Sequence, residues 1–252
     1  RLQHIEREFG VRIVQRSTKG IRFTPQGEYL AGQAGEFINS VERVKNEVKG
    51  LFSEDSGTLE IGASNYITMY TLPQLLEDFQ QVYPAVKFRV VTDWSKNIFS
   101  LVYNQKIQVG FVSIDYGGAK HMQLLYEEPV CIAYHKSFEL ADLPDMPRIV
   151  YESDYLLKSQ LDKWWREHFT VPPEISMRVS KLENCRQMIA HGLGYALMPS
   201  RIIRDDKHIF ARPLVHKDGK PVLRKTWMLY GDLDRELPIV RHFIDFVSEY
   251  KF

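Results

Sequence analysis

A change of hydrophobic period divides the chain into three parts, and the first is residues 1–24. Apolar residues over 2–9 have helical spacing and are followed by a glycine, a common helix stop. The segments 11–15 and 21–23 then alternate as strands do, around a Ser-Thr-Lys-Gly turn. Thr24-Pro25 next supplies a helix cap and a proline suited to the first helical position. The pattern predicts the back half of a winged helix-turn-helix.

The second part, residues 25–56, is a long helix with a narrow apolar seam that ends in a polar hinge. The seam follows an unbroken heptad pattern over three heptads and consists of Leu30, Ala34, Phe37, Val41, Val44, Val48 and Leu51. So narrow a stripe favours pairing with a second helix, so we interpret it as a dimerisation helix. The alternative is an ordinary amphipathic helix that lies on its own domain.

The third part, residues 57–252, alternates strands and helices. Its first strands are expected at 58–63, 86–92 and 109–113 and its first helices at 72–82 and 96–103. This βαβαβ order is typical of a parallel sheet with right-handed crossovers. Later strands are expected at 130–134, 148–151, 175–179, 195–198, 209–214 and 222–230, and later helices at 156–168, 182–191 and 239–250.

We therefore predict an α/β effector-binding domain made of two subdomains with a cleft between them. Subdomain I comprises 57–128 and 229–252, because the last strand and helix return to the first unit. Subdomain II comprises 129–228.

Composition narrows the class of protein. The chain has 252 residues, of which 44% are apolar and 26% charged, as in ordinary globular proteins. It has no apolar run long enough for a membrane span and no signal-peptide pattern. The two cysteines, Cys131 and Cys185, lie far apart without metal-binding spacing, which favours the reducing cytoplasm and argues against a metal site.

Positive charge is concentrated at the start of the chain, although the net charge of the whole is only +1. Residues 1–26 carry six basic and two acidic side chains, a balance suited to a phosphate-facing surface. The candidate DNA contacts are Arg16, Lys19 and Arg22 on the hairpin, with Arg1 and Gln3 on the preceding helix. For Arg22 and Lys19 the alternative is a merely exposed basic side chain. Since the chain opens at Arg1 in mid-helix and without Met, we expect the first half of the DNA-binding domain to be absent.

Polar side chains follow several of the predicted strands. Ligands of open α/β sheets bind at the carboxyl ends of strands, where helix N-termini can hold an anion. The candidates in the first subdomain are Ser64, Asn65, Tyr66, Ile67, Ser95, Lys96 and Ser113, and those in the second are Ser153, Tyr155 and Asn184. The alternative for most of them is plain helix capping or a solvated helix start.

Motifs for catalysis or cofactors are missing from the sequence. Gly192-Leu193-Gly194 lacks the third glycine of a dinucleotide loop and precedes a strand. The eight histidines form no metal-binding pattern, and no serine lies in a nucleophile elbow. Cys185 is interpreted as buried and inert. We expect a protein without enzymatic activity, cofactor or metal.

Several of these segments together resemble the LysR-type transcriptional regulators. The matching segments are Ile5–Val11, Phe23–Gly27, the long helix, Gly57–Gly62, Leu72-Pro73 and His191–Pro199. The resemblance implies an N-terminal DNA-binding domain, a dimerising linker helix and a periplasmic-binding-protein-like effector domain. It also implies homodimers that often pair into tetramers, binding to promoter DNA, and control by a small co-inducer that we expect to be anionic.

A narrower resemblance is to the branch that contains the citrate-responsive catabolite control protein C of Gram-positive bacteria. It depends on Trp94-Ser95, Trp164-Trp165, Cys185–Met188 and Thr226-Trp227. Citrate-binding members of that branch carry an arginine at the end of the third strand, where this sequence has Ser113. Loss of a bidentate carboxylate partner argues against citrate.

A second hypothesis is a solute-binding receptor of the transport type that does not bind DNA. The heptad seam and the basic hairpin count against it, as does the lack of a signal sequence.

Overall fold

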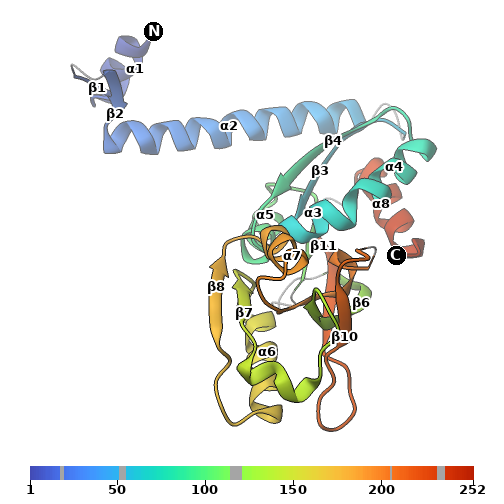
Figure 1. The fold of residues 1–252 in the computed structure, drawn as a ribbon. Coiled ribbons are helices and arrows are strands. Elements are labelled where there is room, and N and C mark those ends of the chain that lie inside the picture. Colours follow the sequence, from blue (N-terminus) through green and yellow to red (C-terminus); the bar gives the residue numbers. More distant parts are fainter. Residues whose placement is uncertain (18–19, 51–54, 114–120, 205, 232–235) are drawn as a thin grey trace.

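The computed structural model describes the chain except for residues 18–19, 51–54, 114–120, 205 and 232–235 (Figure 1). A small N-terminal module, one long helix and an α/β domain follow one another, and the long helix carries the module away from the body of the domain (Figure 1). In the described segments, no helix is both long and apolar enough to cross a membrane.

The N-terminal module consists of helix α1 (Leu2–Phe9) and the antiparallel strands β1 (Val14–Ser17) and β2 (Gly20–Phe23). Helix α1 ends at Gly10, whose φ of 65° is the left-handed conformation that glycine adopts easily. The helix, hairpin and glycine stop match the predicted pattern.

The first strand of this module begins at Val14, three residues later than the sequence pattern predicted. The Glu6 carboxylate explains the difference, because it accepts the backbone N–H groups of Ile13 at 2.8 Å and Val14 at 3.2 Å. These bonds hold the chain in a turn against α1 before the hairpin ladder starts.

The long helix α2 spans Pro25–Gly50. Its cap is the predicted Thr24, whose hydroxyl oxygen accepts the backbone N–H of Gly27 at 3.0 Å. Most of the predicted seam is open to solvent, including Phe37 at 71% and Val44 at 52% exposure. Leu51, the last seam residue, lies outside the described residues.

The main sheet begins as the predicted parallel βαβαβ unit. Its strands are β3 (Gly57–Ala63), β4 (Val86–Thr92) and β5 (Val109–Val112), and β3 lies between the other two. The sheet is mixed, however, because β11 (Leu223–Tyr230) pairs antiparallel with β5 and then with β6 (His121–Tyr134).

The far half of β6 carries a different set of partners. Residues Val130–Tyr134 pair antiparallel with β9 (Ala196–Pro199) and β10 (Phe210–Pro213). Strands β7 (Arg148–Tyr151) and β8 (Ile175–Val179) form a separate parallel pair. The second unit is therefore not a repeat of the first, and the subdomain boundaries given above stay a prediction.

Strand β6 is nine residues longer at its start than the pattern predicted, beginning at His121 rather than Val130. Residues His121–Pro129 are mostly half-buried and include several polar side chains, so the segment lacks the apolar run that marks a buried strand. Its ladder with β11 defines the strand instead.

Helices pack on the main sheet and on the β7–β8 pair. They are α3 (Asn65–Tyr70), α4 (Leu72–Val82), α5 (Ser95–Tyr103), α6 (Tyr155–His168), α7 (Leu182–Ala190) and α8 (Pro238–Glu249), with 3-10 turns at Leu140–Asp145 and Ser200–Ile202. Helices α4 and α8 pack together through Phe79 and Phe243, whose ring centroids lie 4.9 Å apart in an edge-to-face pair. Short α3 was not predicted as a separate helix.

Gly27 offers a test of how the module is joined to α2. A Cβ there would lie 2.0 Å from the backbone carbonyl oxygen of Ile13, whereas a Cβ at Gly32 would meet nothing within 4 Å. We expect Gly27→Ala to destabilise the module by about 1–3 kcal/mol through overpacking. Gly32→Ala should instead stabilise α2 by about 0.5–1 kcal/mol. Hydrogen exchange of the module's backbone amides and thermal unfolding measure these changes in stability. Equal stabilities of the two variants would contradict the close contact between Gly27 and Ile13.

Candidate functional site

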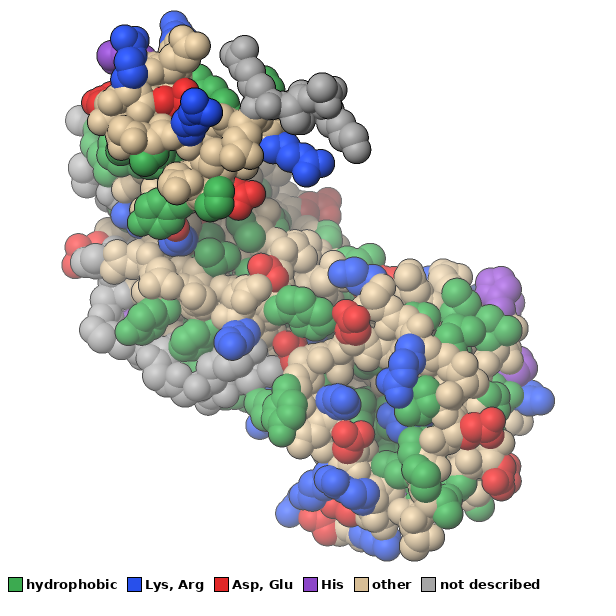
Figure 2. All heavy atoms as spheres, turned by 90° about the vertical axis from the view of Figure 1, so that its left-hand side faces the viewer, with side chains coloured by type: hydrophobic (Ala, Val, Ile, Leu, Met, Phe, Trp, Pro, Cys, Tyr) green, Lys and Arg blue, Asp and Glu red, His purple; other side chains and the backbone are tan. Residues whose placement is uncertain are grey.

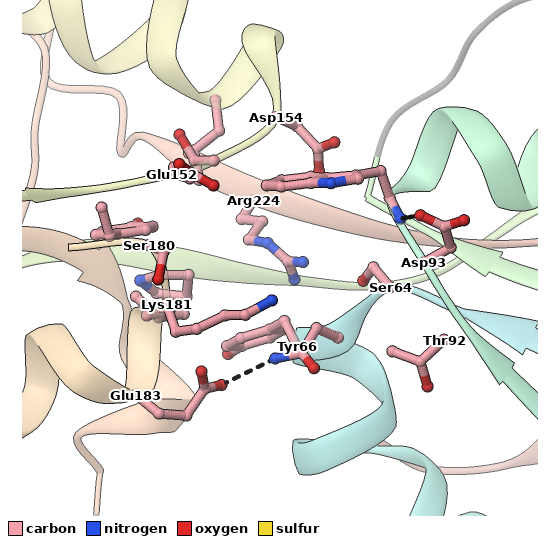
Figure 3. Close-up of a pocket in the computed structure, with 17 residues that line it drawn as sticks. Ser64, Tyr66, Thr92, Asp93, Glu152, Asp154, Ser180, Lys181, Glu183 and Arg224 are labelled. Carbon is pink, nitrogen blue, oxygen red and sulfur yellow. Dashed lines mark hydrogen bonds between the residues drawn. The ribbon is translucent and has the colours of Figure 1, made fainter. Parts of the chain in front are cut away.

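A cavity of about 290 Å³ lies where β3 and β4 of the main sheet and the separate pair β7 and β8 end (Figure 3). Its walls come from the ends of β3 and β4, the loops after β7 and β8, and strand β11. The polar and aromatic lining residues are Ser64, Asn65, Tyr66, Thr92, Asp93, Trp94, Tyr151, Glu152, Ser153, Asp154, Ser180, Lys181, Glu183 and Arg224. This is the edge at which ligands of open α/β sheets bind.

The floor of the cavity is built around a buried ion pair between Arg224 and Glu128. Their side chains are 7% and 3% exposed, and Arg224 Nη1 lies 3.3 Å from Glu128 Oε1. The guanidinium also donates to the Ser113 hydroxyl and lies over the ring of Tyr66, 4.0 Å from its centroid. Strands β6 and β11 and helix α3 are thereby joined beneath the cavity.

Tyr66 completes this network from above. Its hydroxyl donates to Glu128 Oε2 at 2.7 Å, and the same oxygen accepts the backbone N–H of Arg201 at 3.2 Å. Burial, together with the negative charge of Glu128, raises the pKa of Tyr66 far above its ordinary value. The phenol therefore stays protonated and serves as a donor at any physiological pH.

Ser64 presents an unused hydroxyl to the cavity. The residue is 7% exposed, and its Oγ has no hydrogen-bond partner in the part of the chain that the structure describes. Figure 3 shows Ser64 on the same side of the cavity as the ends of the Arg224 and Lys181 side chains. A buried hydroxyl without a partner is costly, so a bound polar group would recover the lost hydrogen bond.

Acidic side chains also line the cavity, and Glu152 and Asp154 lie across it from Lys181 and Ser64 (Figure 3). Asp154 accepts a hydrogen bond from the Ser95 hydroxyl at 3.3 Å. Burial raises the pKa of Asp154, while the charge of Arg224 and the Ser95 hydrogen bond lower it, and the net shift is upward. Glu183 accepts from the Asn65 side-chain amide at 3.4 Å, across the mouth of the cavity (Figure 3).

Four of the sequence-predicted effector contacts line this cavity: Ser64, Asn65, Tyr66 and Ser153. Ser113 lines an adjoining cavity of about 320 Å³, which shares Asp154 and Arg224 with the first. Whether these residues bind an effector stays a prediction.

Five of the predicted contacts do not line this cavity. Ile67 is fully buried in the core, because it points inward from α3. Ser95 is also fully buried, one layer behind the lining, where it donates to Asp154 and accepts from the Ser113 backbone. Lys96, Tyr155 and Asn184 are exposed residues of α5, α6 and α7 that do not line the cavity.

Sequence reasoning missed Arg224, the central residue of the floor. It lies in a strand where Arg224, Thr226 and Met228 are buried while Lys225 is exposed. A charged residue in the inward register of such a strand is a signal of a functional or paired group, and the period-two pattern contained it. Lys181 and Glu183, at the start of α7, also line the cavity and were not among the predicted contacts.

The predicted DNA contacts lie in the N-terminal module. Arg1, Gln3 and Arg22 are exposed, Arg16 lies on β1, and Lys19 falls outside the described residues. Figure 2 shows Lys and Arg side chains on this module, at the top of the molecule, interspersed with apolar and acidic ones. Among the described residues, no group of three His, Cys, Asp or Glu side chains is placed to hold a metal ion.

Comparison with known proteins gives one family. Residues 52–251 match the model of the LysR substrate binding domain. The chain is 32% identical to YraN, an HTH-type transcriptional regulator of Bacillus subtilis, over 98% of this chain and 86% of that protein. It is 29% identical to a second HTH-type regulator of Bacillus subtilis, YkuM, over 99% of this chain and 86% of that protein.

Solved structures agree on the fold. Full-length CbnR in complex with its target DNA superposes with a TM-score of 0.74 at 16% sequence identity, covering 98% of this chain and 86% of that chain. A second crystal structure of CbnR, a LysR family transcriptional regulator, gives a TM-score of 0.62 at 18% identity, over 98% of this chain and 88% of that chain.

The buried ion pair is open to a stability test. Glu128→Gln leaves the Arg224 charge buried without its counter-charge, so we expect a loss of about 3–5 kcal/mol in the free energy of unfolding. Its neighbour supplies a matched control, because Glu127 pairs with Lys225 at 2.8 Å on the exposed side of the same strands. Glu127→Gln should cost at most about 1 kcal/mol. Urea unfolding measures both, and equal midpoints for the two variants would refute the structural role of the pair.

Proposed function

The chain belongs to the LysR family of transcriptional regulators, and from that premise we propose that a small molecule bound in the cavity floored by Arg224 controls its binding to promoter DNA. The single observation that carries the proposal is that the ends of β3, β4, β7 and β8 meet at this cavity around the buried Arg224 and the Ser64 hydroxyl, which has no hydrogen-bond partner among the described residues. In this proposal the protein acts in the cytoplasm and catalyses no reaction.

Ligand binding has a physical reason at this place. Arg224 is held in position by Glu128 and by the Tyr66 ring, so its remaining N–H groups are preorganised. A carboxylate group that bound there would also satisfy Ser64 Oγ. Because β3, β4, β7 and β8 contribute separate walls, a ligand that contacts all of them favours the closed arrangement of those walls over an open one.

Polar contacts between α2 and the domain provide a route to the DNA-binding module. Lys106 pairs with Glu36 of α2 at 2.6 Å, and Arg89 of β4 bonds to Asn39 of α2 at 3.3 Å. The same Arg89 pairs with Glu60 of β3 at 3.2 Å. A shift of β3 and β4 on ligand binding would therefore alter the angle of α2, with a coupling of about 1–3 kcal/mol being typical of such systems.

Self-association is part of the proposal. The seam residues Phe37, Val41, Val44 and Val48 are exposed on the single chain and follow the heptad pattern of a paired helix. We infer a homodimer through α2, with dimers able to pair into tetramers.

The finer placement in the citrate-responsive branch is also a proposal. This placement depends on the sequence segments named above. With Ser113 next to Arg224, the site has one arginine there, whereas a tricarboxylate would need more than one to pair its carboxylates. Citrate is therefore not our proposed effector.

A solute-binding receptor without DNA binding is not favoured. The two curated relatives described above are HTH-type transcriptional regulators, and each matches nearly the whole of this chain, including the N-terminal module and α2.

DNA binding is tested with the protein expressed from its complete gene. The DNA upstream of that gene should be retarded in a gel, with the affinity falling at least about tenfold between 50 and 200 mM salt through counterion release. Arg22→Gln should weaken binding and lower the salt slope by about one, as expected for a phosphate contact. Lys220→Gln, in a distant exposed turn, should do neither. Failure to retard any upstream fragment would contradict the proposal.

The dimer seam is tested by sedimentation. Val44→Glu places a charge in the seam and should convert dimers or tetramers into smaller species at micromolar concentration, because a buried unpaired charge is costly. Val171→Glu is the matched control, since Val171 is similarly exposed, at 50% against 52%, but lies outside α2. A Val44→Glu protein with unchanged mass would argue for a helix that packs only on its own domain.

A further inference from the structure

The charges around the cavity are not those of a site for a simple polyanion. Four carboxylates line it, from Asp93, Glu152, Asp154 and Glu183, against the cations Lys181 and Arg224. One of the two cations is already compensated, because Arg224 pairs with buried Glu128. A ligand with two or three carboxylates would therefore bring further negative charge into an acidic site, where like charges at short range repel.

We propose that the effector carries an ammonium group as well as a carboxylate, and that it belongs to the α-amino acids. This inference rests on the proposed function, because it specifies the ligand of the same cavity. It replaces the sequence-based expectation of an anionic co-inducer with a zwitterionic one.

The carboxylate end is assigned to Ser64, Lys181 and Arg224. Figure 3 shows the Lys181 ammonium, the Arg224 guanidinium and the Ser64 hydroxyl converging on one part of the cavity. Ser64 is more than nine-tenths buried, at 7% exposure, and none of the described residues bonds to its Oγ. Lys181 forms no ion pair with any residue that the structure describes. One carboxylate would satisfy all three groups through charge-assisted hydrogen bonds.

The ammonium end is assigned to Asp154 and Glu152, which follow β7. Asp93 and Glu183 are less available, because Asp93 accepts from the Trp94 backbone at 2.7 Å and Glu183 from Asn65. Asp154 has only the Ser95 hydroxyl as a hydrogen-bond donor, at 3.3 Å, and Glu152 has none among the described residues. Trp94, 46% exposed, also lines the cavity and offers a ring face to a cation.

Size agrees with this class of ligand. A cavity of about 290 Å³ is at the small end of ligand sites, so it suits a metabolite of amino-acid size better than a nucleotide or a large cofactor.

The experiment is a thermal-shift screen, followed by calorimetry, on the full-length protein. The probes are the twenty L-amino acids, with citrate, succinate and putrescine as a tricarboxylate, a dicarboxylate and a diamine. We expect at least one amino acid to raise the Tm, and the three other probes to leave it unchanged. For the best amino acid, the analogue lacking the amino group should bind at least about tenfold more weakly, a loss of about 1.4 kcal/mol.

Variants then locate the ammonium site. Asp154→Asn and Glu152→Gln should each weaken amino-acid binding at least about tenfold, which corresponds to one lost charge-assisted contact. Asp154→Asn should fold, because burial disfavours the charged carboxylate, and Glu152 is exposed, so loss of binding would not reflect unfolding. Glu127→Gln, on an exposed strand position outside the cavity, should bind as the parent does.

Several results would overturn the inference. A Tm raised by citrate or succinate, a response to putrescine alone, or no response to any amino acid would each do so. Retardation of the upstream DNA is measured on the same protein without ligand, so it reports separately on the proposed function. Retardation with a citrate response would leave a LysR-type regulator with an anionic effector.

Discussion

The buried pair of Arg224 and Glu128 is the constraint on which the rest of the effector domain depends. Two charges at 7% and 3% exposure are stable only when they are close together and hydrogen-bonded. The Glu128 carboxylate accepts from Arg224, Tyr66 and the Arg201 backbone. The requirement fixes the register of β11 against β6 and the position of α3 at the end of β3. It also explains why the cavity lies where it does, since the pair forms its floor.

Local periodicity was enough to predict most elements of the fold. Strands β4, β7 and β8 and helix α4 begin and end at the predicted residues, and α4 buries a clear apolar face of Leu72, Leu75 and Phe79. Local periodicity could not predict contacts between segments that lie far apart in the sequence. The first half of β6 is defined by its ladder with β11, and the late start of β1 by the Glu6 carboxylate eight residues before Val14.

The candidate site was only partly predictable for the same reason. Strand ends pointed to Ser64, Asn65 and Tyr66, since the chain order of a βαβ unit places such residues at one edge. Arg224, however, reaches the cavity from a strand about a hundred and sixty residues away along the chain from Ser64. Only the folded sheet shows that the positive charge of Arg224 is compensated by Glu128, and this compensation makes the net charge of the whole site more negative.

The two long strands β6 and β11 restrict the way in which the cavity walls can move. Eight residues of β11 pair continuously with β6, apart from one bulge between Thr226 and Trp227, and β6 then continues as the partner of β9 and β10. A ladder of this kind resists sliding and separation, but twists at low cost, most readily at a bulge. Closure of the walls on a ligand is therefore expected as a rotation about the ladder axis. Since a rotation moves distant points furthest, a small twist beneath the cavity becomes a larger swing at the far end of α2.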